Sequence, residues 1–210
     1  MPVNEQAAGG GINAMAASAT LHCLTGCAIG EIAGLIIGTA IGLSNVGTIV
    51  LAIALAFLFG YSLSTLPLVK AGLGFFAALG VVLAADTLSI ATMEVVDNAV
   101  MAAIPGAMDA GLGNPVFWLG MIVALTAAFI AAYPVNRYLL SRGKGHALTH
   151  HYHHGTQATD WRRYIPSFGS GALAAVILAF MLGGLLVAAV SGLDTGGHDP
   201  EAVTAPAVEG

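Results

Sequence analysis

Four side chains that bind metals or protons lie close together in one apolar segment: His22, Cys23, Cys27 and Glu31. Cys23, Cys27 and Glu31 follow one another at intervals of four, so on a helix they form one stripe. Thiolate and imidazole ligands together favour Cu(I) or Zn(II) over hard ions such as Mg²⁺. The spacing therefore predicts a site for a transition-metal cofactor or cargo, with copper first and zinc second.

Helix packing is the alternative for the same stripe. A free cysteine behaves as a small hydrophobic residue, so neither Cys23 nor Cys27 alone indicates a site. Glu31 changes the balance, because an ionisable group at the centre of a membrane helix costs roughly 2.5 to 3.5 kcal/mol and is usually functional. The two cysteines are not at the CxxC spacing of redox motifs. A disulfide between them has poor geometry within one regular helix, so it is an alternative that we do not expect.

A ladder of acidic and sulfur side chains follows a later apolar segment. Carboxylates in a membrane span should face a bundle interior or a water-filled path, so the ladder predicts a cation or proton route. Asp86 should lie near mid-membrane, and Met108 with Asp109 at the mouth. The alternative is that the outer part extends into water, where its acids are ordinary surface charges. The route comprises Asp86, Met93, Glu94, Asp97, Asn98 and Met101.

Histidines concentrate in the polar stretch at about 141–168. Imidazoles spaced by four on a short helix can share a Zn(II) or Cu(II) ion when they are neutral. The alternative is a solvated loop, or a segment that meets the lipid headgroups. The predicted ligands are His146, His150, His151, His153 and His154.

Glycines recur at every fourth position of the first apolar segment. Overlapping GxxxG units remove side-chain bulk from one helix face, so that another helix backbone can approach closely. The stripe predicts an inner helix of the bundle, or a contact with a second copy or with partner membrane helices. Its members are Gly26, Gly30, Gly34, Gly38 and Gly42.

The composition predicts that the chain is a membrane protein. The chain has 210 residues, of which 57% are hydrophobic and 8% charged, against about 25% charged in soluble domains. A water-soluble fold could not cover its surface with so few charges. The net charge of −5 comes without a basic patch, which excludes nucleic-acid binding.

Five apolar segments have the roughly 20 residues that a helix needs to cross the bilayer. We predict an all-α, polytopic transmembrane helix bundle of about five spans. The third segment is ambiguous, since about 34 helical residues reach about 51 Å against a hydrocarbon core of about 30 Å, so it is either tilted or broken. The spans run from about 17–43, 47–66, 71–104, 116–140 and 169–190.

A single crossing of the third segment puts every Lys and Arg on one side, as the cytoplasmic bias of basic residues predicts. We therefore expect a cytoplasmic N-terminal segment at 1–16, the bundle at 17–192 with the histidine-rich loop in the cytoplasm, and a disordered acidic tail outside at 193–210. The start of the chain has no Lys or Arg ahead of an apolar run, so no cleaved signal is expected.

The string TLHCLTGCAIGE, followed by MEVVDN, PVN and a GHA segment with further histidines, resembles an uncharacterised family of small bacterial multi-pass membrane proteins known by a domain-of-unknown-function label. The resemblance covers roughly residues 20–154, and HCxxGCxxGE is its most specific part. It implies a bacterial or archaeal inner membrane and carries over no catalytic residues.

Three functions fit these patterns. The first is a transition-metal carrier or sensor that uses the Cys, His and carboxylate groups. The second is a non-transporting subunit that docks to a larger membrane complex through the glycine stripe, and the third is a proton-coupled transporter of a small solute. An enzyme is less favoured, because no Ser-His-Asp order, phosphate loop or acid pair in an aqueous cleft is present.

Overall fold

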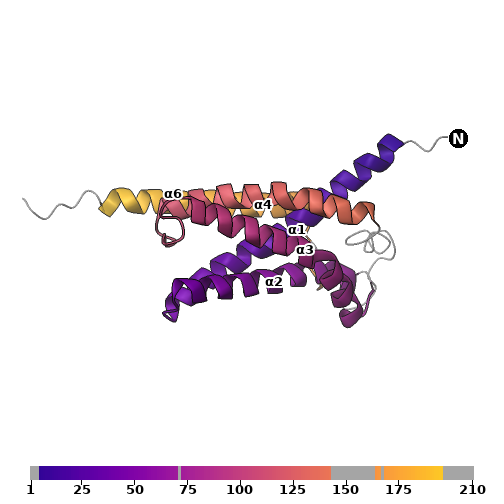
Figure 1. The fold of residues 1–210 in the computed structure, drawn as a ribbon, viewed down its shortest axis with the longest axis horizontal. Helices are drawn as coiled ribbons and strands as arrows, with labels where there is room; N and C mark the ends of the chain where they lie inside the picture. The colour runs from indigo at the N-terminus through magenta and orange to yellow at the C-terminus, as the bar shows by residue number, and fades with distance from the viewer. Residues whose placement is uncertain (1–4, 71, 143–163, 167, 196–210) are drawn as a thin grey trace, which may run out of the picture.

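The computed structural model describes residues 5–70, 72–142, 164–166 and 168–195, and the long elements among them are all α-helices (Figure 1). The predicted all-α class is confirmed. Four helices are long and apolar enough to cross a membrane, and the bent third helix brings the number to five. The helices are α1 (Glu5–Ala40), α2 (Asn45–Lys70), α3 (Phe75–Ala103), α4 (Pro115–Ser141) and α6 (Ser170–Thr195).

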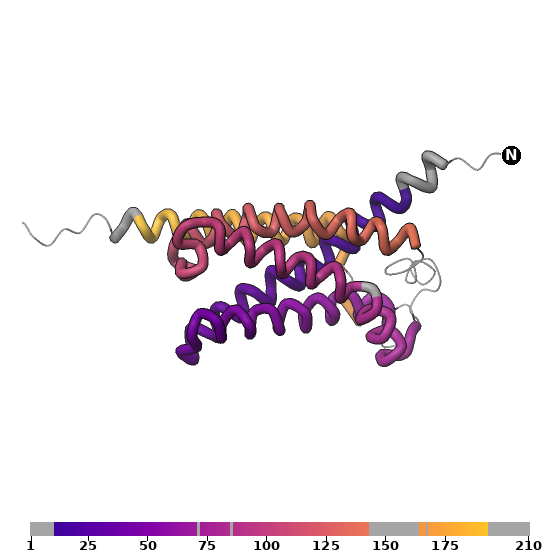
Figure 2. The backbone as a smooth tube through the Cα atoms, in the orientation of Figure 1, coloured from indigo at the N-terminus to yellow at the C-terminus, as the bar shows by residue number. Residues whose placement is uncertain are grey.

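The third apolar segment is bent rather than straight. Its two pieces, Phe75–Ala84 and Asp86–Ala103, meet at 51°, and Figure 2 shows the first piece turned away from the line of the second. The bend explains how a segment too long for the hydrocarbon core fits the bundle. The second piece carries all the polar residues predicted for the ion route.

Local sequence signals set the start of α4 and the end of α1. Asn114 caps α4, because its side chain accepts a hydrogen bond from the backbone N–H of Val116 at 2.9 Å, and Pro115 follows at the first helical position. After α1 the chain turns at Gly42, which has a φ of +71° that favours glycine.

The glycine stripe of α1 packs against α2 within the same chain. A methyl group at Gly26, Gly30 or Gly34 would collide with the α2 backbone at Gly60, Ala56 or Ala52, and one at Gly38 would meet the side chain of Thr48. α1 also contacts α3, α4 and α6, so it is the inner helix of the described bundle.

This packing changes two expectations about the stripe. The face proposed for a partner membrane helix is covered by α2, because the small residues of both helices let their backbones touch. Gly42 differs from the other four members: no heavy atom lies within 4 Å of a methyl group built there, and the residue serves the turn instead.

Gly30→Leu should destabilise the protein strongly, because the new side chain would meet backbone atoms that cannot move aside. We expect the melting temperature of the detergent-purified protein, followed by circular dichroism, to fall by about 5 °C or more. Gly80→Leu is the matched control, since a methyl group at Gly80 has no heavy atom within 4 Å. Equal melting temperatures for the two variants would contradict the close contact between α1 and α2.

Helix α6 packs against α4 through the side chain of Trp118. Gly184 lies directly against the Trp118 ring, and Phe180 contacts the same ring edge-on. Trp118 Nε1 in turn donates to the carbonyl oxygen of Leu112 at 2.7 Å. Through this tryptophan, α6 holds the connection at 104–114, which forms part of the cavity described below.

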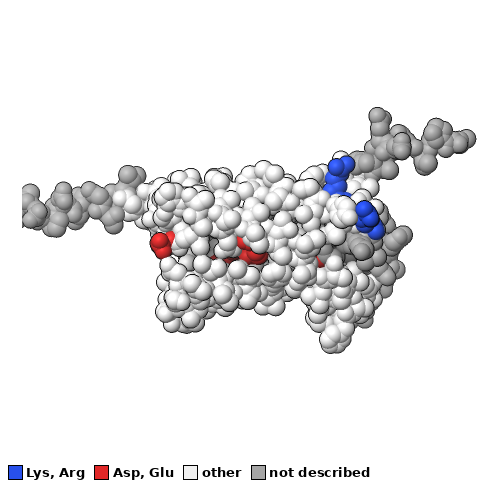
Figure 3. All heavy atoms as spheres, in the orientation of Figure 1, with Lys and Arg blue, Asp and Glu red and all other residues white. Residues whose placement is uncertain are grey.

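Charges are distributed unevenly along the molecule. Figure 3 shows basic side chains gathered at one end, whereas acidic atoms are visible in the middle of this face and at the other end. The basic end is where α1 begins and where α2 and α4 finish (Figure 1). We call it the N-terminal end, and the opposite one the mouth end.

Candidate functional site

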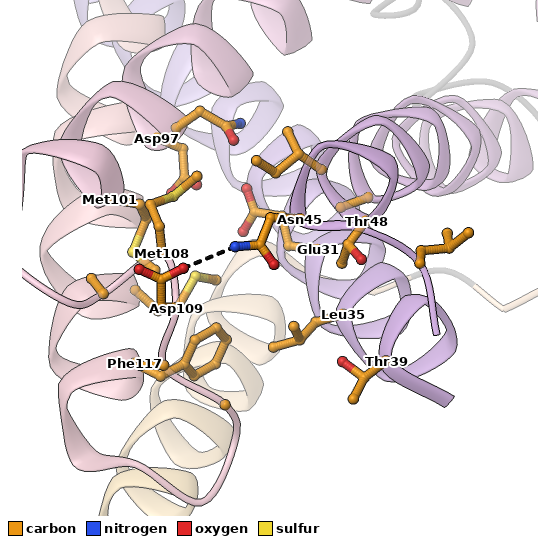
Figure 4. Close-up of a pocket in the computed structure, with 18 residues that line it drawn as sticks. Glu31, Leu35, Thr39, Asn45, Thr48, Asp97, Met101, Met108, Asp109 and Phe117 are labelled. Atoms are coloured by element: carbon orange, nitrogen blue, oxygen red, sulfur yellow. Dashed lines mark hydrogen bonds between the residues drawn. The ribbon is translucent and has the colours of Figure 1, made fainter. Parts of the chain in front are cut away.

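A cavity of about 410 Å³ opens at the mouth end, between α1, the start of α2, the end of α3 and the connection at 104–114. Figure 4 shows Glu31, Asp97 and Asp109 among the side chains that line it. Asp109 is exposed, whereas Asp97 and both carboxyl oxygens of Glu31 are buried. Asn45 Nδ2 donates to Asp109 Oδ1 at 2.9 Å, which joins α2 to the connection across the cavity. The cavity therefore leads from an exposed polar mouth to two buried acids.

Glu31 and Asp97 form the acidic floor of this cavity. The two carboxyl groups are close enough to interact directly. Both oxygens of Glu31 and Oδ1 of Asp97 are buried, and they have no hydrogen-bond partner among the described residues. Because unpaired buried carboxylates are costly, this pair needs a bound proton or a cation to balance its charge.

A column of thiol and carboxyl groups continues from the floor toward the N-terminal end. On α1, Cys27 neighbours Glu94 and Cys23 neighbours Asp86, and both of these acids belong to α3. Both cysteines are free thiols, so no disulfide joins them. Cys23 is 0% exposed and Cys27 1%. The column therefore runs inward in three steps: first the acidic floor, then Cys27 with Glu94, then Cys23 with Asp86.

The outer acids of α3 are not surface charges. Glu94 and Asp97 are each 4% exposed, so the alternative in which this part of the segment extends into water is wrong. Asn98 lines the cavity and donates from Nδ2 to the backbone oxygen of Glu94 at 2.9 Å. The bundle encloses these polar groups because α1, α2 and α4 all contact α3.

Sulfur atoms accompany the acids. Met101 and Met121 are buried and line the cavity together with the exposed Met108, while Met93 is fully buried beside the column. Met121 was not predicted, because on α4 its spacing from Phe117 and Leu125 indicates only a core position. Its neighbours on α3 could not be inferred without the packing of α3 against α4.

The predicted metal site at His22, Cys23, Cys27 and Glu31 is not assembled as a single ligand set. Among the described residues, no group of three or more His, Cys, Asp or Glu side chains is arranged to hold a metal ion. Intervals of four separate the stripe residues by about 6 Å along the helix axis, so each meets a different part of α3. The His22 ring instead donates from Nδ1 to the carbonyl oxygen of Ser18 at 2.9 Å.

The five histidines of the predicted loop lie outside the described residues, and the ligand set predicted there stays a prediction. Of the acidic tail predicted at 193–210, residues 193–195 are the last residues of α6, and those from 196 on lie outside the described residues. Arg137 is described and is exposed at the N-terminal end of the bundle. The predicted loop ligands are His146, His150, His151, His153 and His154.

One polar group at the inner end of the column was missed. Asn136 on α4 donates from Nδ2 to Thr20 Oγ1 on α1 and to Ser89 Oγ on α3, each at 2.9 Å. A lone asparagine in an apolar span, two residues after Pro134, was the available signal. The partners could not be identified, because they come from helices far apart in the sequence.

Comparison with known families agrees with the resemblance noted from the HCxxGCxxGE string. The family model described as "Domain of unknown function (DUF4396)" matches residues 13–145, which is more than half of the chain. No curated protein and no solved structure matches the chain. The matched region spans most of α1 and all of α2, α3 and α4, and it holds the whole column, while α6 lies beyond it. The chain is therefore a multi-span membrane protein that belongs to the DUF4396 family.

Proposed function

We propose that this protein carries a transition-metal cation across the membrane, with Cu(I) as the first choice and Zn(II) as the second. The observation that carries the proposal is the continuous column of buried carboxyl and thiol groups that begins at the cavity floor. Membrane-embedded acids that face a bundle interior are the usual mark of an ion pathway. The acids supply negative charge, and the sulfur atoms select the ion.

The donor set along the route favours a soft cation. Thiolate and thioether ligands select Cu(I), whereas carboxylate and carbonyl oxygens suit hard ions. Two thiols and the thioethers of Met101 and Met121 accompany the acids from the cavity inward. Zn(II) is second because it prefers four ligands in a tetrahedron, and the described residues hold no group of three nitrogen, sulfur or carboxylate ligands.

The arrangement suits passage better than storage. A conducted ion must bind well enough to enter and weakly enough to leave, which favours several incomplete sites in series over one closed site. Here successive pairs are separated by about one helical turn on α1, and by about one turn and then about two turns on α3. The separation of the stripe residues, which prevents one tight site, is consistent with a relay.

We further propose that the N-terminal end faces the cytoplasm of a bacterial or archaeal cell. Lys70 lies in the last turn of α2. Arg142 is the C-cap of α4, and Arg137 lies between one and two turns before it. Cytoplasmic loops are enriched in basic residues. The cavity then opens to the outside. The histidine-rich loop follows α4, so it would offer imidazole ligands to the cation on the cytoplasmic side.

A matched pair of methionine variants tests the proposal. Purified protein, with the five loop histidines replaced by alanine, is titrated anaerobically with Cu(I), and bound copper is measured by elemental analysis after desalting. Met101→Leu should weaken binding by about tenfold, which corresponds to about 1.4 kcal/mol. Met181→Leu should not change it, because Met181 lines a separate, apolar groove between α1, α4 and α6. No copper binding by the parent protein would refute the proposal.

Proton-coupled transport of a small solute is the second candidate. It is favoured by the absence of a three-ligand metal group among the described residues, since a proton needs only the carboxyl groups. In that case Cys23→Ser and Cys27→Ser would leave transport unchanged, while replacement of Glu31 would abolish it. The effect of the cysteine variants therefore separates the two functions.

A further inference from the structure

The polar cluster around Asn136 closes the column on the side away from the cavity. Asn136 is 4% exposed, and its amide joins α4 to Thr20 of α1 and Ser89 of α3. Thr20 Oγ1 donates its own hydrogen to the carbonyl oxygen of Ala16 at 2.7 Å, so it is free to accept from Asn136. Three helices are thus tied together by one side chain.

This cluster lies directly beyond the last thiol of the column. Thr20 precedes Cys23 by three residues and so lies less than one helical turn nearer the N-terminal end. Ser89 neighbours the Cys23 thiol as well as Asn136. The column is therefore open to a cavity at the mouth end and tied shut at the other.

We propose that Asn136 is the inner gate of this path, and that its two hydrogen bonds must break before Cys23 can be reached from the N-terminal end. Pro134 supports movement of this part of α4, because proline has no N–H to donate to the carbonyl oxygen of Ile130. The turn that carries Asn136 is thus held to the rest of α4 by fewer backbone bonds. The structure corresponds to the state that is open toward the mouth.

Labelling of Cys23 tests the gate without any cargo. Because the chain has two cysteines, Cys27→Ser leaves Cys23 as its only thiol. In sealed vesicles of both orientations, distinguished by an N-terminal tag, a membrane-impermeant maleimide then reports access from each face. Asn136→Leu keeps the side-chain size and removes both donors. Its labelling from the N-terminal face should rise about tenfold, which corresponds to about 1.4 kcal/mol.

Two further variants make the result specific. Ser89→Ala removes one of the two bonds and should give a smaller rise on the same face. Thr126→Val is the control, since the Thr126 hydroxyl only donates to the carbonyl oxygen of Ile122 and lies on the exposed face of α4. No rise in Asn136→Leu and Ser89→Ala would overturn the gate, and so would an equal rise from both faces, which indicates lost packing.

The proposed gate depends on the proposed function in one respect, namely that a path for some cargo runs through the bundle. If copper binding fails but labelling rises on the N-terminal face alone, the gate stands and the cargo is wrong. If copper binds and labelling does not change, the cargo stands and the gate is wrong.

Discussion

Glu31→Gln should reduce the initial rate of Cu(I) uptake into proteoliposomes by about tenfold or more. Glutamine preserves the shape of the side chain and removes the charge that balances a cation at the cavity floor, where both Glu31 oxygens are buried beside Asp97. Loss of about 1.4 kcal/mol of this stabilisation accounts for a factor of ten, and a partly buried charge pair readily exceeds it.

Asp109→Asn is the matched control for this experiment. Asp109 is exposed at the mouth, outside the buried column, so solvent screens its charge, and asparagine keeps the Oδ1 that accepts from Asn45. We expect uptake within about fivefold of the parent, because an exposed charge contributes about 0 to 1 kcal/mol. Glu31→Gln should also melt no lower than the parent, since removing a costly buried charge does not destabilise the bundle. Normal uptake by Glu31→Gln would exclude the acidic floor from the path.

The double variant Cys23→Ser with Cys27→Ser should lose Cu(I) affinity by about a hundredfold, which corresponds to about 2.7 kcal/mol. Serine is close in size to cysteine, but its hydroxyl is a hard oxygen donor that a soft cation does not favour. The measurement is competition with a Cu(I) chelator of known affinity, again with the loop histidines replaced by alanine.

The pattern across the single variants is equally informative. Each cysteine has a different carboxyl neighbour on α3, so each single variant should weaken binding by part of the total. Ser191→Ala, on the exposed face of α6, is the control and should bind as the parent does. Unchanged affinity in the double variant would contradict a thiol relay and leave the proton-coupled candidate.

The helices were predictable because bilayer thickness imposes a length on every span. All five described helices overlap the predicted segments, and the ambiguity of the third is explained by the bend in α3. Burial of Asp86 and Asp97 also followed from sequence, since the cost of a carboxylate facing lipid leaves only the bundle interior. Each of these predictions requires only the sequence of a single helix and the properties of the lipid or water around it.

Features that depend on the register between helices were not predictable. The α1 stripe alone did not show that Cys27 meets Glu94, or that Cys23 meets Asp86, because pairing is set by how α1 and α3 slide against each other. The glycine stripe predicted close packing but did not name α2 as the partner. Asn136 was missed for the same reason: its two acceptors lie 116 and 47 residues away in the sequence.

The most direct test of the central claim is uptake of cation by the purified protein in proteoliposomes. The lumen holds a Cu(I) chelator, and Ag(I) serves as a redox-stable substitute for Cu(I) in parallel samples. We predict saturable accumulation of Cu(I) and Ag(I) above that of protein-free liposomes, slower accumulation of Zn(II), and none of Mg²⁺. Uptake of Cu(I) and Ag(I) no faster than in protein-free liposomes would contradict the account.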